Sequence, residues 1–457
     1  MSHILVLGGG PAGYVAALRA AQLGAAVTVV EAGEIGGTCL NRGCIPTKAM
    51  VASAERLRHA RAAAAFGVLA GEPAVDFATL LARRDAVTRQ LREGVEQLLK
   101  ARKVRVVPGR GRLAGPGLLE LEDGGRLEGD AVIIASGSEP MRLPVFPGDD
   151  PSVVTSDELL GLDHLPRSLL VVGGGVIGCE FAAVFAELGA EVHIVELLDQ
   201  LIPGEDKRTG RTLQQAFKKS GIEVRLKTAV QEVVSSSSDG VTVRLSDGSE
   251  AAAEIVLVAV GRRPVSRGMG FEEAGVGLDE HGFVVADDTL RTAVEHVFAA
   301  GDVAGPPLLA HWAYHEGAIA GENAVTGSHL KVDRRVVPNC VFTHPEVASC
   351  GITEDRAAAA GMEVAVAQVR INGNSKAVIE GEDDGCVRIV VEKGSGVVLG
   401  ASLVGPRVTE LVHEIALAAR ERLPLEAVAR TIHAHPTLSE AVGEAALSGL
   451  GRSMHYL

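Results

Sequence analysis

The chain has 457 residues, of which 47% are hydrophobic and 22% are charged, and this predicts a globular protein of roughly two to four domains. Its formal net charge is −14, and lysine and arginine form no block. The composition therefore excludes an electrostatic basis for binding nucleic acid or an anionic membrane.

The first residues, MSHILVLGGG, are an apolar run followed by glycines and predict a buried strand and a glycine turn. They lack the basic segment and cleavage site of a signal peptide. No apolar run reaches the roughly 18 residues of a membrane span. We therefore expect a cytoplasmic protein. In that compartment a close cysteine pair is more often catalytic or metal-binding than a structural disulfide.

An internal repeat organises the first half of the chain. Residues 5–31 (LVLGGGPAGYVAALRAAQLGAAVTVVE) and 170–196 (LVVGGGVIGCEFAAVFAELGAEVHIVE) are identical at 14 of 27 positions. Each copy reads as an apolar strand, a Gly-x-Gly-x-x-Gly turn, a helix and a second strand that ends in Glu. This order, found twice, predicts an α/β fold with two Rossmann-like nucleotide-binding domains rather than two glycine turns that bind nothing.

The glycines and the terminal Glu that the two copies share have expected roles in holding a dinucleotide. The paired residues are Gly8 and Gly173 for the tight turn, Gly10 and Gly175 for approach to a pyrophosphate, Gly13 and Gly178 for helix packing, and Glu31 and Glu196 for a ribose hydroxyl. Glu196 favours NAD(H) over NADP(H), because its carboxylate would repel a 2′-phosphate and no arginine follows before Arg208.

Three later segments are predicted to extend this arrangement. Residues 131–140 and 255–264 are each a buried strand that ends near a glycine, and 297–305 is a further strand followed by Gly-Asp. Asp302 could reach a cofactor hydroxyl or could be an ordinary turn residue. Residues 336–457 change in character, with strand-like runs followed by helix-like runs, and predict a separate α+β domain.

The segment GGTCLNRGCIPTK, residues 36–48, holds Cys39 and Cys44. On a regular helix these side chains would point about 140° apart, so a bond between them needs a distorted backbone, which Gly43 and Pro46 favour. A metal site would need further ligands at matching spacing, which the neighbouring sequence lacks. A dithiol beside two nucleotide units implies FAD at the first and NAD at the second, since a flavin exchanges electrons with both.

Two polar pairs are candidates for supporting this chemistry. Lys48 near a flavin would stabilise its reduced form and would need a carboxylate partner, for which Glu180 is the candidate; both could instead be surface charges. In IHAHPTLSEAV, His435 oriented by Glu440 could act as the base of thiol–disulfide exchange, or it could be a helix-cap neighbour without chemistry.

From residue 3 to about 455 the chain resembles the flavin-linked pyridine nucleotide–disulfide oxidoreductases, on GGTCLNRGCIPTK, GGGVIGCE, AAGDVAG, LLAHWAYHEG, FTHPEVASCGITE and HAHPTLSE. The match is best to the members that oxidise protein-bound dihydrolipoamide with NAD⁺. This implies that Cys39 exchanges with substrate, that Cys44 contacts the flavin, and that His435, held by Glu440, acts on the cysteines of the other subunit of a homodimer.

The resemblance also implies the cofactor contacts and the partners. FAD would be held by Gly8, Gly10, Gly13, Glu31, Lys48, Gly111, Ser136, Gly137, Asp302 and Ala310, and NAD by Gly173, Gly175, Gly178, Glu196, Val230 and Gly261. The partners would be the lipoyl domain and subunit-binding region of a dihydrolipoamide acyltransferase, or a glycine-cleavage carrier protein. The expected segments are an FAD-binding domain at 1–145, an NAD-binding domain at 146–265, a second FAD-binding or central segment at 266–335 and a dimerisation domain at 336–457.

The sequence departs from the family pattern at a few positions. Ser136 stands where threonine is usual, and Trp312 and Tyr314 stand where polar residues are more usual. None of these changes removes a catalytic group. Two alternatives stay open: a reductase of a low-molecular-weight disulfide of the mycothione or glutathione type, and a non-catalytic core subunit of a multienzyme complex.

Overall fold

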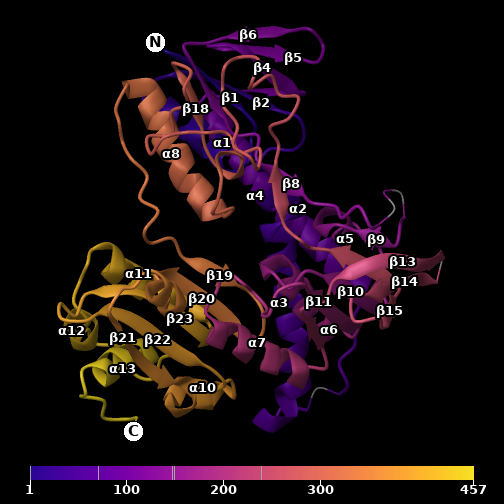
Figure 1. The fold of residues 1–457 in the computed structure, drawn as a ribbon, viewed down its shortest axis with the longest axis vertical. Coiled ribbons are helices and arrows are strands. Elements are labelled where there is room, and N and C mark those ends of the chain that lie inside the picture. The colour runs from indigo at the N-terminus through magenta and orange to yellow at the C-terminus, as the bar shows by residue number, and fades with distance from the viewer. Residues whose placement is uncertain (1, 70, 147, 149, 238, 457) are drawn as a thin grey trace.

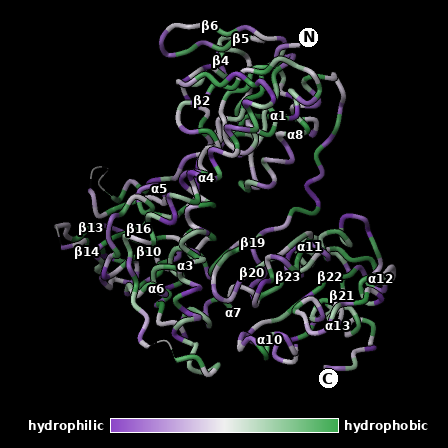
Figure 2. The backbone as a smooth tube through the Cα atoms, turned by 180° about the vertical axis from the view of Figure 1, so that it is seen from behind, coloured by the Kyte–Doolittle hydropathy of each residue, from purple (hydrophilic) through white to green (hydrophobic). Residues whose placement is uncertain are grey.

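The computed structural model describes residues 2–456 except 70, 147, 149 and 238. In Figure 1 an upper lobe contains α1 and α8, while two further bodies lie below it, one built around β10 and one around β20–β23. Figure 2 shows the same three bodies from behind, with hydrophobic stretches running through their strands. No helix within the described ranges is both long and apolar enough to cross a membrane.

The first body contains a parallel five-stranded sheet of order β18-β7-β1-β2-β3. Its strands are β1 (His3–Leu7), β2 (Ala26–Glu31), β3 (Arg105–Pro108), β7 (Ala131–Ile134) and β18 (Val297–Ala299). The central strands are mainly apolar, and most of their residues are buried, as in parallel strands covered by helices. The covering helices include α1 (Pro11–Gln22), α4 (Phe77–Ala101) and α8 (Ala310–Thr326).

The second body repeats this sheet with the order β12-β11-β10-β16-β9, again parallel. Its strands are β9 (Val153–Val154), β10 (Ser168–Val172), β11 (Glu191–Glu196), β12 (Glu223–Leu226) and β16 (Ile255–Val258), and its helices are α5 (Ser156–Leu159), α6 (Val176–Leu188) and α7 (Lys207–Lys219). The predicted repeat is confirmed, because β10 and β11 begin and end 165 positions after β1 and β2.

Small antiparallel elements join and extend these sheets. They are β4 (Gly111–Gly115), β5 (Leu118–Leu121) and β6 (Arg126–Glu128); β13 (Val230–Ser237), β14 (Gly240–Leu245) and β15 (Glu250–Ala253); and the ribbon of β8 (Ser138–Pro140) with β17 (Arg262–Pro264). In this ribbon, β8, where the chain leaves the first body, pairs with β17, where the chain returns to it.

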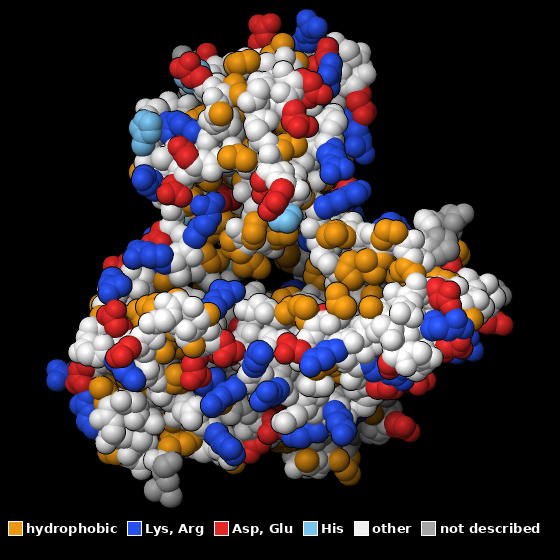
Figure 3. Space-filling model, in the orientation of Figure 1, with side chains coloured by type: hydrophobic (Ala, Val, Ile, Leu, Met, Phe, Trp, Pro, Cys, Tyr) orange, Lys and Arg blue, Asp and Glu red, His pale blue; other side chains and the backbone are white. Residues whose placement is uncertain are grey.

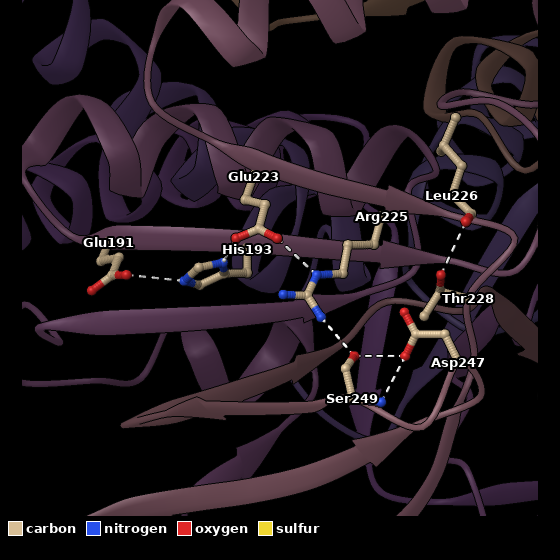
Figure 4. A network of polar contacts seen from close by, with 8 residues as sticks. All are labelled: Glu191, His193, Glu223, Arg225, Leu226, Thr228, Asp247 and Ser249. Carbon is tan, nitrogen blue, oxygen red and sulfur yellow. Dashed lines mark hydrogen bonds and ion pairs between the residues drawn. The ribbon is translucent and has the colours of Figure 1, made fainter.

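A polar network on the outer edge of the second sheet connects it to the β13–β15 sheet (Figure 4). The ring of His193 hydrogen bonds to Glu223 at 3.0 Å, and Glu223 accepts a bond from Arg225. Arg225 also donates to Ser249, in the turn between β14 and β15. Exposed pairs of this kind each contribute little stability, so we assign the network no part in the site.

The third body is an antiparallel five-stranded sheet of order β19-β20-β23-β22-β21. Its elements are β19 (Asn339–Val341), β20 (Glu346–Gly351), β21 (Val364–Arg370), β22 (Cys386–Glu392), β23 (Val398–Gly405), α9 (Glu354–Ala359), α10 (Ser375–Glu380), α11 (Val408–Arg420), α12 (Leu425–Arg430) and α13 (Glu440–Gly449). This confirms the predicted α+β architecture. We propose that the three bodies correspond to segments 1–145 with 266–335, 146–265 and 336–457.

Candidate active site

The cysteine pair lies at a break between two helices. α2 (Gly37–Arg42) ends before Gly43, whose φ of −146° and ψ of −111° are not helical, and α3 (Cys44–Ala62) begins at Cys44. Gly36 before the pair has a φ of +97°, which a residue with a side chain rarely adopts. The distortion predicted from the spacing is therefore confirmed, and it places Cys44 at a helix N-terminus, where a thiolate is stabilised.

The two thiols are free and half-buried, and each shifts the pKa of the other. Cys39 as a hydrogen-bond donor lowers the pKa of Cys44, and the positive charge of Lys48 lowers it further against the opposing effect of burial. The same interaction, together with burial, raises the pKa of Cys39. In the reduced pair these effects favour ionisation of Cys44 before that of Cys39.

Lys48 is tied to the second body by an ion pair. Its Nζ lies 2.7 Å from Glu180 Oε2 of α6, and the side chains are 31% and 4% exposed. The other oxygen of Glu180 accepts the N–H of Phe342 at 3.0 Å, and the ring of Phe342 lies 4.8 Å from Lys48 Nζ. One carboxylate therefore connects all three bodies beside the cysteines, and the surface-charge alternative is wrong.

We expect Glu180→Gln to lower the thermal unfolding midpoint and to reduce the free energy of unfolding by about 2–3 kcal/mol, because it leaves Lys48 without its anionic partner. Burial acts to lower the pKa of Lys48, but Glu180 outweighs it and raises that pKa above 10.5. The stabilisation that the ion pair gives the folded state is therefore complete below pH 10.5. It is lost as the pH rises through the higher pKa that Lys48 has in the folded protein. Scanning calorimetry of both proteins at pH 8 and above pH 10.5 checks both points.

Glu139→Gln is the matched control, because its 2.8 Å pair with Arg263 is 50% and 66% exposed and we expect almost no change there. An equal shift in the two variants would show that Glu180 contributes no more than a surface charge does.

The turn after β1 is shaped to hold a pyrophosphate. A Cβ on Gly8 would lie 2.2 Å from the Ala135 oxygen, and one on Gly13 would lie 1.8 Å from the Gly8 oxygen. By contrast, a Cβ on Gly10 would meet nothing closer than Gly37 Cα, at 3.8 Å. The N-terminus of α1 also has no side-chain cap, so its N–H groups are available to an anion. The residues therefore fit the first dinucleotide.

The turn after β10 has the same construction. A Cβ on Gly173 would lie 2.5 Å from the Ala259 oxygen, and one on Gly178 would lie 2.0 Å from the Gly173 oxygen. A Cβ on Gly175 would have no atom within 4 Å, and α6 has no side-chain cap. The second turn thus presents the same open backbone and fits a second dinucleotide.

The two strand-terminal carboxylates also match each other. Glu31 accepts the N–H of Gly9 at 2.6 Å and a second backbone N–H two residues after itself at 2.7 Å. Glu196, which is buried, accepts the N–H of Gly174 at 2.6 Å and the N–H two residues after itself at 2.7 Å. These bonds hold each carboxylate beside its glycine turn, and the remaining lone pairs can accept hydroxyl donors.

The ribbon of β8 and β17 contains hydrogen bonds that link Asp302 to Arg262 through Ser138. Asp302 accepts a bond from the Ser138 hydroxyl at 2.5 Å, and Arg262 donates to both the hydroxyl and the carbonyl oxygen of Ser138 at 2.7 Å. The hydroxyl of Ser136 donates to the Val265 carbonyl oxygen at 2.6 Å. Sequence reasoning selected Asp302 and Ser136 but missed Ser138 and Arg262, because no local motif marks a contact between segments about 124 positions apart.

The other predicted cofactor residues lie at or next to the ends of helices and strands. Gly111 begins β4 against Leu7 and Val30, Gly137 has a φ of +75° beside β8, Ala310 begins α8, Val230 begins β13, and Gly261 has a φ of +121° just before β17. In Figure 3 a hollow lined largely by hydrophobic side chains separates the upper lobe from the bodies below.

His435 and Glu440 are paired as predicted. Nδ1 of His435 lies 2.9 Å from Glu440 Oε1, and Glu440 Oε2 accepts the N–H of Thr437 at 2.9 Å. Burial acts to raise the pKa of Glu440, but these contacts outweigh it and lower that pKa. The His435 side chain is 69% exposed, and within the described part of one chain Glu440 is its hydrogen-bond partner. A single chain thus orients the imidazole without bringing it to the cysteines.

The structure adds residues that sequence reasoning did not select. Glu316 is 1% exposed and accepts the N–H of Gly301 at 2.8 Å, directly before Asp302; burial raises its pKa to about 7. Tyr14 of α1 and Tyr314 of α8 pack together, with ring centroids 5.9 Å apart. The sequence feature that could have drawn attention to Tyr314 was its departure from the family pattern. Its contact with Tyr14 follows only from the packing of the two helices.

Comparison with known proteins places the chain in one family. The family model described as pyridine nucleotide-disulphide oxidoreductase matches residues 2–317, and the model of its dimerisation domain matches residues 337–446. The dihydrolipoyl dehydrogenase of Halobacterium salinarum is 42% identical, over 100% of this chain and 98% of the relative. Dihydrolipoyl dehydrogenase 2 of Haloarcula marismortui is 41% identical, over 99% of this chain and 98% of the relative.

Solved structures agree with this placement. LpdA of Mycobacterium tuberculosis superposes with a TM-score of 0.91 at 30% identity, over 98% of this chain and 99% of LpdA. The HOCl-induced flavoprotein disulfide reductase RclA of Escherichia coli superposes with a TM-score of 0.87 at 27% identity, over 96% of this chain and 98% of RclA. The chain therefore belongs to the pyridine nucleotide-disulphide oxidoreductase family.

Proposed function

We propose that this protein oxidises protein-bound dihydrolipoamide to lipoamide and reduces NAD⁺ to NADH. The observation that carries the proposal is the dithiol at the start of α3, beside the Lys48–Glu180 pair. In the chain it follows the first of the two glycine turns, after β1 and after β10, that fit a dinucleotide. The full-length likeness to proteins named dihydrolipoyl dehydrogenase supports this choice of substrate.

The chain itself would carry out the sulfur chemistry, starting from the oxidised Cys39–Cys44 pair. A substrate thiolate attacks Cys39 Sγ, a substrate–Cys39 disulfide forms, and Cys44 leaves as a thiolate. The second substrate sulfur then attacks the first, lipoamide leaves as its cyclic disulfide, and Cys39 takes the electron pair. The hydrogen bond from Cys39 and the charge of Lys48 lower the pKa of Cys44, which suits it to be the first leaving group.

Base catalysis would come from His435 of the partner subunit. Glu440 occupies Nδ1, so Nε2 is the nitrogen that takes the proton of the attacking thiol and returns one to Cys39. Because the chain has the dimerisation domain of this family, a homodimer is supported, and it would supply the imidazole that one chain leaves exposed.

FAD and NAD are the cofactors of this family, and when bound they accept the two electrons of the dithiol and deliver them as NADH. FAD would be held by Gly8, Gly10, Gly13, Glu31, Lys48, Gly111, Ser136, Gly137, Asp302 and Ala310. NAD would be held by Gly173, Gly175, Gly178, Glu196, Val230 and Gly261. We also propose that the protein works in the cytoplasm on the lipoyl domain of an acyltransferase or on a glycine-cleavage carrier protein.

We expect Glu196→Ala to raise kcat/KM with NADP⁺ relative to NAD⁺ by about 10- to 100-fold, because it removes a carboxylate that repels a 2′-phosphate. Initial rates with both nucleotides measure the ratio. Glu191→Gln, at the exposed start of the same strand, is the control and should leave the ratio unchanged. A ratio that stays constant in Glu196→Ala would mean that other groups set the nucleotide preference.

A substrate panel tests the proposal. The purified protein should reduce NAD⁺ with free dihydrolipoamide and with a dihydrolipoyl domain. It should reduce glutathione and mycothiol disulfides much more slowly with NADH or NADPH. The reverse order would favour a reductase of low-molecular-weight disulfides, and purification without flavin absorbance would favour a non-catalytic core subunit.

A further inference from the structure

Helices α1 and α8 pack with their backbones in direct contact, and glycines on α8 make this possible. A Cβ on Gly317 would lie 2.3 Å from the Ala12 oxygen, and one on Gly321 would lie 2.6 Å from the Ala16 oxygen. A side chain at either glycine would therefore force the two helices apart. The contact brings the part of α8 around Gly317 to the first turn of α1, directly after the glycine turn that fits the first dinucleotide.

The Gly301–Asp302 turn lies at this helix crossing and is held there by one buried carboxylate. Gly301 has a φ of +78°, and a Cβ there would lie 2.9 Å from the Ala12 Cβ and 3.5 Å from the Ala313 Cβ. Its N–H donates to Glu316 Oε2 of α8 at 2.8 Å. Glu316 is 1% exposed, so bulk water does not compete for this bond. Because Asp302 directly follows, the bond fixes the backbone from which its side chain extends.

The second oxygen of Glu316 has a charged partner on the segment between α8 and β19. Arg334 Nη2 lies 3.2 Å from Glu316 Oε1, and Arg334 Nη1 lies 3.7 Å from Asp288 Oδ1. The Arg334 guanidinium also lies 5.4 Å from the centre of the Trp312 ring, on α8. Its charge opposes the effect of burial and favours the ionised form of Glu316. An ionised carboxylate is the stronger acceptor for the N–H of Gly301.

A separate contact orients the side chain of Asp302. The Ser138 hydroxyl donates to Asp302 Oδ2 at 2.5 Å and accepts a bond from Arg262 Nε at 2.7 Å. Since a hydroxyl has one proton, Ser138 can accept from Arg262 and still donate that proton to Asp302. Ser138 therefore sets the direction of the carboxylate, while Glu316 fixes its backbone.

We propose that Glu316, supported by Arg334, is a positioning residue that holds the Gly301–Asp302 turn in place to bind a hydroxyl of FAD. The inference rests on the proposed contact of Asp302 with FAD, but not on dihydrolipoamide as the substrate. Its consequence is that weakening the bond between Glu316 and Gly301 speeds the release of FAD.

Exchange of bound FAD for isotopically labelled FAD tests this role in the holoenzyme without any substrate. Glu316→Met removes both acceptor oxygens and should speed exchange about 10- to 100-fold, the range for losing a hydrogen bond to a charged group. Glu316→Gln keeps an oxygen for the Gly301 N–H and should speed exchange only about threefold. Arg334→Met leaves the carboxylate without its cation and should speed exchange about three- to tenfold. Mass spectrometry of the flavin that the protein retains gives each rate.

A double variant separates positioning from a general loosening of α8. If Glu316 acts through Asp302, the protein with both Glu316→Met and Asp302→Asn should exchange FAD no faster than Asp302→Asn alone. Glu322→Met is the matched control, because Glu322 lies on the same helix and pairs with Arg19 of α1. It should exchange FAD at the wild-type rate.

Arg335→Met is the control for Arg334, because its guanidinium is 67% exposed and pairs with Asp333. Additive effects with Asp302→Asn, equal acceleration in the controls, or a wild-type rate in Glu316→Met would each overturn the proposal. If Glu316→Met does not fold, wild-type rates in both Glu316→Gln and Arg334→Met would overturn it. Holoenzyme that shows the expected exchange rates but does not oxidise dihydrolipoamide would instead refute the proposed function.

Discussion

Replacing Cys44 with serine is expected to abolish NAD⁺-dependent oxidation of dihydrolipoamide, with a loss of at least about 10⁴-fold in kcat/KM. Serine cannot form the disulfide that accepts the substrate electrons, and no other group in the mechanism replaces it. Electron transfer from NADH to an artificial one-electron acceptor should persist, because it does not need the dithiol. Both rates are measured on the same flavin-loaded sample.

Cys386→Ser provides the matched control, since this cysteine lies on β22 of the third body and burial raises the pKa of its thiol. It should retain nearly full activity in both assays. Substantial lipoamide activity in Cys44→Ser would refute the dithiol mechanism, whereas loss of both activities would show only that flavin binding had failed.

The second large effect is expected at His435. His435→Gln should lower kcat/KM for dihydrolipoamide by about 10²- to 10⁴-fold, the range for removing a general base. Glutamine keeps a hydrogen bond to Glu440 but cannot take up the thiol proton. The control is His281→Gln, on an exposed turn, which should behave as wild type.

Mixed dimers show which subunit supplies the base. A heterodimer of one Cys44→Ser chain and one His435→Gln chain, isolated with two affinity tags, contains one site with both groups intact if the imidazole acts across the interface. We expect about half of the wild-type activity per dimer, although each parent is inactive. An inactive heterodimer would place His435 beside the cysteines of its own chain.

Local sequence patterns predicted the elements that hold the cofactors. The strand, glycine turn, helix and terminal Glu obey short-range rules, so both copies of the repeat were predicted correctly, and so was the break at Gly43. The Lys48–Glu180 contact was also predicted, although it spans 132 positions, because a buried lysine needs a carboxylate partner.

Contacts between segments without such a chemical requirement could not be predicted. Ser138 meets Arg262 because two short strands pair into a ribbon, and Tyr14 meets Tyr314 because α1 and α8 lie in backbone contact. Neither follows from periodicity or composition. The resemblance to the family implied that His435 acts on the cysteines of a second chain, and this stays a prediction because one subunit shows only its pairing with Glu440.

The most direct test of the account is an absorption spectrum of the purified protein during anaerobic titration with dihydrolipoamide. The account predicts a flavin spectrum at the start and, after two electrons per subunit, a long-wavelength band from the Cys44 thiolate beside the flavin. That band should be absent when the Cys44→Ser protein is titrated in the same way. Bleaching of the flavin without the band in the wild-type protein, or the same band in Cys44→Ser, would contradict the central claim that Cys44 lies against the flavin.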